Sequence, residues 1–191
     1  MACAHLIVLC GAPCSGKTTL AAQLRESLGW PLFAKDAVKE LLFDALGAAD
    51  RAWSKRLSRA SYDILFHAAE ALLAAGGNCI LEGNFRWSEN EARFASLRRA
   101  APQARCLQIF CDAPTQLLIA RYRARVALGS RHEGHVDAAA AQEVEAELRD
   151  ARAPLPIAGP MLTFDSSVND PRAALVLISK VHVWAKNTAS E

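Results

Sequence analysis

A glycine-flanked turn near the N-terminus constrains this chain of 191 residues more than any other feature. Residues 11–18 read Gly-Ala-Pro-Cys-Ser-Gly-Lys-Thr, which fits the pattern G-x-x-x-x-G-K-[ST] at every fixed position. The apolar run HLIVLC (5–10) precedes the turn, and a helical pattern follows from Lys17. The sequence therefore predicts a turn between a buried strand and a helix, which is the context that gives the pattern its structural meaning.

The residue types in this turn suit a phosphate ligand. Glycines let the backbone curl so that successive N–H groups point inward, and the helix N-terminus adds unsatisfied donors and partial positive charge. Lys17 would reach the β- and γ-phosphates of a nucleoside triphosphate, and the Thr18 hydroxyl would bind Mg²⁺. A turn that matches by chance is the alternative. The predicted ATP-binding residues are Gly11, Ala12, Pro13, Cys14, Ser15, Gly16, Lys17, Thr18 and Thr19.

Strands and helices alternate along the rest of the chain. Short apolar runs predict strands at 5–10, 31–35, 78–83, 104–111 and 161–165. Helical patterns are predicted at 17–28, 36–46, 51–75, 88–100, from about 114 onward, at 138–150 and at 172–186. Ser88 and Glu91 form a predicted capping box at the start of the fourth of these helices. This alternation predicts a single three-layer α/β domain with right-handed crossovers, and periodicity alone leaves the strand order open.

Composition excludes several classes of protein. The chain has 22 Lys and Arg against 20 Asp and Glu, a balance that argues against a nucleic-acid coat or a membrane-surface protein. No apolar run has the length of a transmembrane helix, and the N-terminus lacks the positive region of a signal peptide. The six cysteines form no C-x-x-C pair. We therefore expect a reduced, cytoplasmic protein.

Asp36 follows the second predicted strand, at the sheet edge where ligands bind in α/β domains. A carboxylate there could accept the proton of an attacking hydroxyl. Asp36 could also be the N-cap of the following helix, and both roles could hold together. Lys39 lies one turn further on the same face, where it could bind an anionic part of an acceptor or be a solvated lysine.

Four segments carry a family resemblance. They are Gly11–Thr19, AKDAVKE after the second strand, ILEGNFR at the third strand and ARYRAR after the fourth strand. In this order they resemble the small P-loop kinases, which include nucleoside-monophosphate kinases, gluconate and shikimate kinases, chloramphenicol phosphotransferases and polynucleotide kinases. The chain is most similar to the predicted-kinase branch labelled AAA-family ATP-binding proteins. The resemblance implies a parallel five-stranded sheet in the order 2-3-1-4-5 and a lid over about 121–150.

The resemblance also implies roles for single residues. Asp36 matches the proposed base of polynucleotide-kinase-like and antibiotic-phosphotransferase-like relatives. Glu82 stands where relatives carry an Asp that binds the water shell of Mg²⁺, although a structural role is the alternative. Glu82-Gly83-Asn84-Phe85-Arg86 parallels the Asp-Gly-x-x-Arg of nucleoside-monophosphate kinases, without a proline before the arginine. Asn84 and Arg86 are therefore predicted to bind the acceptor, with Arg86 on its phosphate where one is present.

Arginines cluster in the predicted lid. Arg121 and Arg125 are four residues apart on one helix face, where they could stack on adenine and bind the oxygens of the transferring phosphoryl group. Arg123 points elsewhere, and Arg131 lies in the following insert. A solvated basic face is the alternative.

The insert also holds His132, Glu133, His135 and Asp137, whose spacing matches no established zinc site. The two histidines are expected to lie on the lid or to touch substrate.

Together these features predict an ATP-dependent phosphotransferase that acts on a hydroxyl of a small molecule, such as a metabolite, a nucleoside or an antibiotic. Its predicted catalytic residues are Lys17, Asp36 and Arg125, its cofactor is Mg²⁺, and it is expected to be a monomer or a homodimer. The alternatives are a nucleoside-monophosphate kinase, a polynucleotide 5′-hydroxyl kinase and a non-enzymatic ATP-binding regulator. The balanced charge disfavours the polynucleotide kinase because a nucleic-acid groove needs a basic track.

Aromatic residues give a weak indication of the acceptor. The segment 51–75 and the loop after Asn84 are expected to line its pocket. They contain Trp53, Tyr62, Phe66, Phe85 and Trp87, which would favour a planar or partly apolar acceptor unless these side chains simply pack in the core.

Overall fold

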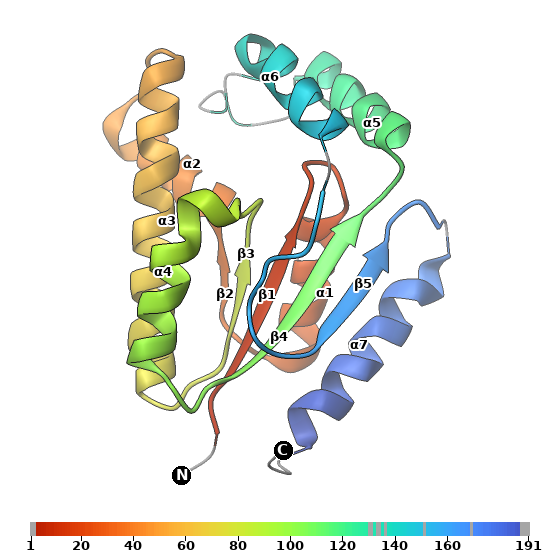
Figure 1. Cartoon of the computed structure of the whole chain (residues 1–191). Helices are drawn as coiled ribbons and strands as arrows, with labels where there is room; N and C mark the ends of the chain where they lie inside the picture. The colour runs from red at the N-terminus through yellow and green to blue at the C-terminus, as the bar shows by residue number, and fades with distance from the viewer. Residues whose placement is uncertain are drawn as a thin grey trace.

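A parallel five-stranded sheet forms the centre of the computed structural model, which describes residues 3–129, 132, 135, 137–150, 152–168 and 170–187. Its strands lie in the order β2-β3-β1-β4-β5, which confirms the predicted order (Figure 1). The bounds are β1 His5–Gly11, β2 Leu32–Ala34, β3 Cys79–Glu82, β4 Arg105–Asp112 and β5 Met161–Asp165. All four pairings of neighbouring strands are parallel, so their carboxyl ends lie along one edge of the sheet.

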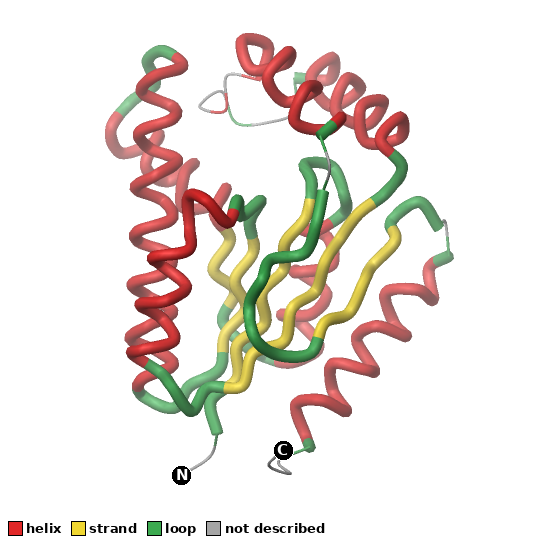
Figure 2. The backbone as a smooth tube through the Cα atoms, viewed as in Figure 1, coloured by secondary structure: helices red, strands yellow, loops and turns green. Residues whose placement is uncertain are grey.

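Helices cover both faces of the sheet, which gives the predicted three layers (Figure 2). Helices α3 and α4 pack on one face, and α1 and α7 pack on the other. Helix α2 lies along α3. The bounds are α1 Lys17–Leu28, α2 Lys35–Leu46, α3 Arg51–Ala74, α4 Trp87–Ala100, α5 Thr115–Leu128, α6 Asp137–Arg149 and α7 Pro171–Lys186.

The side chains of β1 show why this strand is apolar throughout. Leu6 and Val8 point toward α3 and α4, whereas Ile7 and Leu9 point toward α1 and α7. All four side chains are buried, because helices cover both faces of the central strand. Leu9 lies beside Glu82 of β3, so the P-loop that follows β1 begins next to the end of β3.

Helices α5 and α6 lie over the carboxyl edge of the sheet (Figure 1). Leu118 and Tyr122 of α5 and Leu148 of α6 are buried together with Ala12 of the P-loop. Arg152, after α6, joins this pair of helices to the sheet, since its Nε lies 2.8 Å from the Asp112 carboxylate at the end of β4. None of the helices among the described residues has the length and apolar character that a membrane span requires.

The start of α4 differs from the prediction. The helix begins at Trp87 with Arg86 as its N-cap, so the predicted capping box at Ser88 is wrong. The carbonyl of Arg86 accepts hydrogen bonds from the N–H groups of Glu89 and Asn90, both at 3.1 Å, and from Nδ2 of Asn90 at 2.9 Å. The polar side chain that supports this helix start is therefore Asn90, four residues after Arg86.

The six cysteines are free thiols. Burial raises the pKa of the Cys10 thiol to about 11 and that of Cys111 to about 12. These two thiols therefore stay protonated and pack as small apolar groups, as their place in buried strands predicts.

Candidate functional site

A cleft of about 950 Å³ opens at the carboxyl edge of the sheet, under α5 and α6. Fourteen of the sixteen residues predicted for the site line it, and only Gly11 and Ala12, at the base of the P-loop, do not. The predicted residues that line the cleft are Pro13, Cys14, Ser15, Gly16, Lys17, Thr18, Thr19, Asp36, Lys39, Glu82, Asn84, Arg86, Arg121 and Arg125.

The backbone of the P-loop requires its two glycines. Gly11 has φ 131°, and a Cβ at this position would lie 1.9 Å from the carbonyl oxygen of Cys111 on the neighbouring strand. Gly16 has φ 80° and caps the N-terminus of α1. Cys14 has φ 64°, and it is the non-glycine residue with positive φ among the described residues. This curled backbone leads directly into a twelve-residue helix, whose N-terminus faces the cleft.

Lys17 lies inside the curl of the P-loop. Its side chain is buried, and its Nζ donates to the carbonyl oxygen of Ala12 at 2.6 Å. The Oγ of Ser15 is also buried, and it has no hydrogen-bond partner among the described residues. The loop thus holds a buried positive charge and a buried, unsatisfied hydroxyl, an arrangement that an anionic ligand would complete.

Asp36 and two lysines approach the cleft from α2. The helix begins at Lys35 with Ala34 as its N-cap, so the alternative role of Asp36 as N-cap is wrong and its side chain lies in the first turn. The Asp36 carboxylate lies 3.1 Å from Nζ of Lys35. Lys39 is buried, with only 4% of its surface exposed, and its Nζ donates to Oγ of Ser54 at 2.8 Å. Lys39 is therefore not a solvated lysine.

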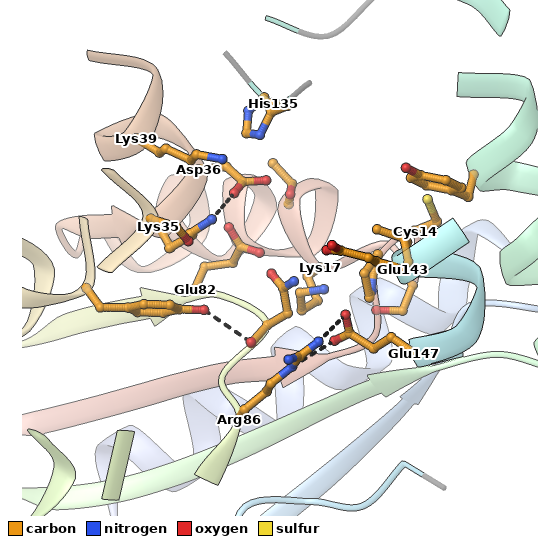
Figure 3. Close-up of a pocket in the computed structure, with 18 of the residues that line it drawn as sticks. Cys14, Lys17, Lys35, Asp36, Lys39, Glu82, Arg86, His135, Glu143 and Glu147 are labelled. Carbon is orange, nitrogen blue, oxygen red and sulfur yellow. Dashed lines mark hydrogen bonds and ion pairs between the residues drawn. The ribbon is translucent and has the colours of Figure 1, made fainter. Parts of the chain in front are cut away.

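Glu82 and Asn84 lie at the end of β3. Glu82 is buried at the sheet edge, and Figure 3 shows it in the same space as Lys17 and Asp36. The hydroxyl of Tyr62 donates to the carbonyl oxygen of Asn84 at 3.1 Å. Burial, and to a lesser degree the carboxylate of Asp36, raise the pKa of the Tyr62 hydroxyl, so it remains a neutral donor.

Two carboxylates of α6 reach across the cleft. Glu147 lies 2.5 Å from the guanidinium of Arg86 (Figure 3). Glu143 lies 2.6 Å from Arg51 and 3.1 Å from Lys55 of α3. The hydrogen bond that Arg86 donates to Glu147 raises the pKa of the Arg86 guanidinium above its ordinary value. These ion pairs join α6 to both walls of the cleft.

Two arginines of α5, Arg121 and Arg125, line the cleft and Arg123 points away from it, as the helical spacing predicts. Arg121 donates to the carbonyl oxygen of Cys14 at 3.3 Å and to Ser166 at 2.8 Å, so it bridges the P-loop and the loop after β5. Arg125 lines the cleft, and its buried Nε has no hydrogen-bond partner among the described residues. Arg123 is exposed and pairs with Glu145 outside the cleft. Arg131 lies outside the described residues.

The histidines of the insert contact α2. Nε2 of His132 lies 3.0 Å from Asp44, and Nε2 of His135 lies 2.8 Å from Glu40. Among the described residues no three His, Cys, Asp or Glu side chains form a cluster that could hold a metal ion. Glu133 and the side chain of Asp137 lie outside the described part of the chain.

The expectation of an aromatic acceptor pocket is wrong. Of the five aromatic residues named for it, only Tyr62 lines the cleft in the described part of the chain. Phe66 and Phe85 are buried in the core, with ring centroids 5.8 Å apart, and Trp87 packs against that core. Trp53 donates its indole N–H to the carbonyl oxygen of Gly47. The rings fill the space between α3, α4 and the sheet, which leaves the cleft to polar side chains.

Sequence reasoning missed the polar wall that α3 contributes. The residues of α3 that line the cleft are Arg51, Ser54, Lys55, Ser58, Arg59 and Tyr62. The sequence does contain a pattern that indicates this wall. Arg51, Lys55 and Arg59 follow one another at intervals of four, so they lie on one helix face. The carboxylates of Glu143 and Glu147 are likewise one helical turn apart on α6.

Comparisons with known proteins agree with this arrangement. A family model described as an AAA domain matches residues 6–151. A solved structure described as a "putative kinase" from Chloroflexus aurantiacus j-10-fl is 35% identical over 96% of this chain and 97% of that chain, with a TM-score of 0.84. No relative was found among the curated proteins.

Two more distant structures share the fold. A sugar kinase from Janibacter sp. HTCC2649 is 19% identical over 95% of this chain and 94% of that chain, with a TM-score of 0.55. A gluconokinase from Sinorhizobium meliloti 1021 is 14% identical over 98% of this chain and 99% of that chain, with a TM-score of 0.51.

Proposed function

We propose, from the premise that this chain belongs to the AAA domain family and has a P-loop kinase fold, that it transfers the γ-phosphoryl group of ATP to a hydroxyl of a small molecule. One observation carries the proposal. Lys17 of the P-loop and Asp36 of α2 line the same cleft (Figure 3). A proposed phosphate-binding group and a candidate base thus line one cleft, as in-line transfer requires.

The P-loop is the proposed site of the ATP phosphates. The curled backbone and the N-terminus of α1 offer N–H donors, and buried Lys17 offers a positive charge. Lys17 would exchange its hydrogen bond with the Ala12 carbonyl for contacts with the β- and γ-phosphates. Arg125, whose buried Nε has no hydrogen-bond partner among the described residues, is proposed to meet the negative charge that develops on the transferring group.

The residues at the sheet edge fit a magnesium ion. The hydroxyl of Thr18 and the buried carboxylate of Glu82 line the cleft next to the P-loop, and Mg²⁺ prefers such oxygen ligands together with water and phosphate oxygens. When bound, the ion would neutralise charge on the phosphates. Glu82 would hold it directly or through a water molecule.

Asp36 is proposed to activate the acceptor. The acceptor oxygen attacks the γ-phosphorus, the bond from that phosphorus to the β–γ bridging oxygen breaks, and ADP leaves. The hydroxyl proton moves to the Asp36 carboxylate. Lys35, 3.1 Å from that carboxylate, keeps the side chain directed along the wall of the cleft.

Helices α5 and α6 are proposed to act as a lid over about 121–150. The ion pairs of Glu143 and Glu147 with α3 and Arg86 would guide this lid across the cleft before the acceptor binds, and the closed lid would exclude water during transfer.

Nucleotide-dependent thermal stability tests the proposal. A ligand at 100 times its Kd stabilises the folded state by about 2.7 kcal/mol, so MgATP should raise the Tm of the wild type. Lys17→Ala should lose this shift, whereas Lys180→Ala, on the exposed side of α7, should keep it. Equal stabilisation of Lys17→Ala and the wild type would show that the P-loop is not the ATP site.

A further inference from the structure

Basic residues are concentrated in the cleft. Among the described residues that line it, ten are Lys or Arg and five are Asp or Glu. The whole chain has 22 basic and 20 acidic residues, so the remainder of the molecule carries more acidic than basic groups. A cavity that is positive within an otherwise acidic molecule attracts anions selectively.

Most of these cations lie away from the P-loop. Lys17, Arg121 and Arg125 belong to the proposed nucleotide side. The other seven lie on the walls formed by α2, α3 and α4, and they are Lys35, Lys39, Arg51, Lys55, Arg59, Arg86 and Arg93. ATP therefore accounts for the smaller part of the positive charge.

The cleft face of α3 contains no acidic residue among the described residues that line the cleft. Arg51, Lys55 and Arg59 follow one another at intervals of four along this face, and two serines lie between them. Arg59 makes no hydrogen bond or ion pair with any described residue, and its side chain is exposed to the cleft. A helix face of cations and hydroxyls is suited to bind an oxyanion.

Carboxylates of α6 form ion pairs with other basic residues near Arg59. Glu143 binds Arg51 and Lys55, and Glu147 binds Arg86. About half of the Glu143 side chain is exposed, and so is about half of the Arg86 side chain that pairs with Glu147; such exposed ion pairs are weak. A ligand that carries its own oxyanion could therefore displace these carboxylates at little cost. The two glutamates mark the positions that the oxygens of such a ligand would take.

We infer that the acceptor is a hydroxyl compound that carries a carboxylate or phosphate group, and that Arg59, Lys55 and Arg86 bind this group in place of Glu143 and Glu147. The inference rests on the proposed function and adds the chemical class of the acceptor. It replaces the planar or apolar acceptor that the aromatic residues would have favoured.

Calorimetry on protein loaded with the non-hydrolysable analogue AMP-PNP and Mg²⁺ tests this directly, because the analogue blocks the P-loop to other anions. The probes are inorganic phosphate, glycerol 3-phosphate with neutral glycerol, and D-gluconate with neutral D-glucitol. We expect at least one anionic probe to bind with 1:1 stoichiometry, at least tenfold more tightly than its neutral counterpart. The phosphate and carboxylate arms show which oxyanion is preferred. Equal binding of charged and neutral partners, or no binding of any anion, would overturn the inference.

Variants locate the bound anion. Arg59→Gln should weaken anion binding at least tenfold and leave the Tm unchanged, since Arg59 is exposed and makes no hydrogen bond or ion pair with a described residue. Arg56→Gln, whose guanidinium lies over Trp53 outside the cleft, is the matched control and should bind as the wild type does. Glu147→Gln should tighten binding severalfold, because it frees Arg86 from an internal competitor. Equal effects of the Arg59 and Arg56 variants, or unchanged affinity in Glu147→Gln, would contradict the assignment.

The two proposals fail in different ways. If AMP-PNP does not bind, the kinase proposal is wrong, and this inference falls with it. If AMP-PNP binds and the anionic probes do not, the kinase proposal stands and only the acceptor class is wrong.

Discussion

The two halves of the cleft are built from different parts of the chain. The nucleotide half consists mostly of one continuous loop and the first turn of α1, with a buried lysine that bonds to its own loop. The proposed acceptor half consists of side chains from α2, α3, α6 and the start of α4; ion pairs join α6 to α3 and to Arg86, and a hydrogen bond joins α2 to α3. The first half is therefore fixed by backbone conformation, and the second by the charge and position of single side chains.

This difference affects how readily substitutions can change the ligand that each half of the cleft binds. A backbone site keeps its ligand as long as the glycines keep their conformations, and Gly11 has no room for a side chain. A side-chain site can change its ligand through one or two substitutions without loss of the fold. Within one fold, we therefore expect the nucleotide to stay the same while the acceptor varies.

The largest effect is expected at Asp36, where the two halves meet. Asp36→Asn keeps the shape of the side chain and removes its basicity, so phosphoryl transfer should slow by roughly 10²–10⁴-fold while ATP binding stays intact. Steady-state ADP release and AMP-PNP calorimetry measure the two quantities. Because Asp36 is not the N-cap, Asp36→Ala should lose as much activity with little loss of Tm.

Asp150→Asn, beyond the end of α6, is the matched control and should behave as the wild type. Full activity in Asp36→Asn would remove this residue from the mechanism and direct attention to Glu82.

A smaller effect is expected at Arg125, on the nucleotide side. Arg125→Ala should lower kcat by roughly 10²-fold, since its guanidinium, half-buried at the cleft, would meet charge that develops at the transition state. Arg123→Ala removes an exposed arginine from the same helix and should leave kcat unchanged. Were Arg125→Ala to lower the Tm with kcat preserved, Arg125 would be a structural residue of α5.

The smallest effect is expected at Lys39, on the acceptor side. Lys39→Met should raise the acceptor KM about tenfold, with kcat and the KM for ATP little changed, because a cation in the acceptor wall stabilises the ground state and the transition state alike. Ser54→Ala removes the Lys39–Ser54 hydrogen bond but keeps the ammonium, so it should have a nearly normal acceptor KM. Similar KM values for the two variants would assign Lys39 a purely structural role.

The sequence predicted which residues line the proposed nucleotide half of the cleft better than which residues line the proposed acceptor half. The P-loop is contiguous, Glu82 ends β3 and Asp36 comes shortly after β2, so local patterns place them. Arg59 and Glu147 come from helices far apart in the chain, and only the packing of α3 and α6 around one cleft brings their positions together. The prediction that Phe66 lines the acceptor pocket was wrong, because helical spacing alone does not show whether a helix face packs in the core or lines a cleft.

The central claim is that the cleft transfers phosphoryl groups, and ³¹P NMR tests it most directly. The sample would contain the wild type, MgATP and a pool of hydroxy acids and sugar phosphates, followed over time beside Lys17→Ala. We predict that the γ-phosphate signal of ATP declines while a new phosphomonoester signal grows at the same rate, and that Lys17→Ala produces neither change. ATP loss that yields only inorganic phosphate, or no ATP loss in the wild type, would contradict the account.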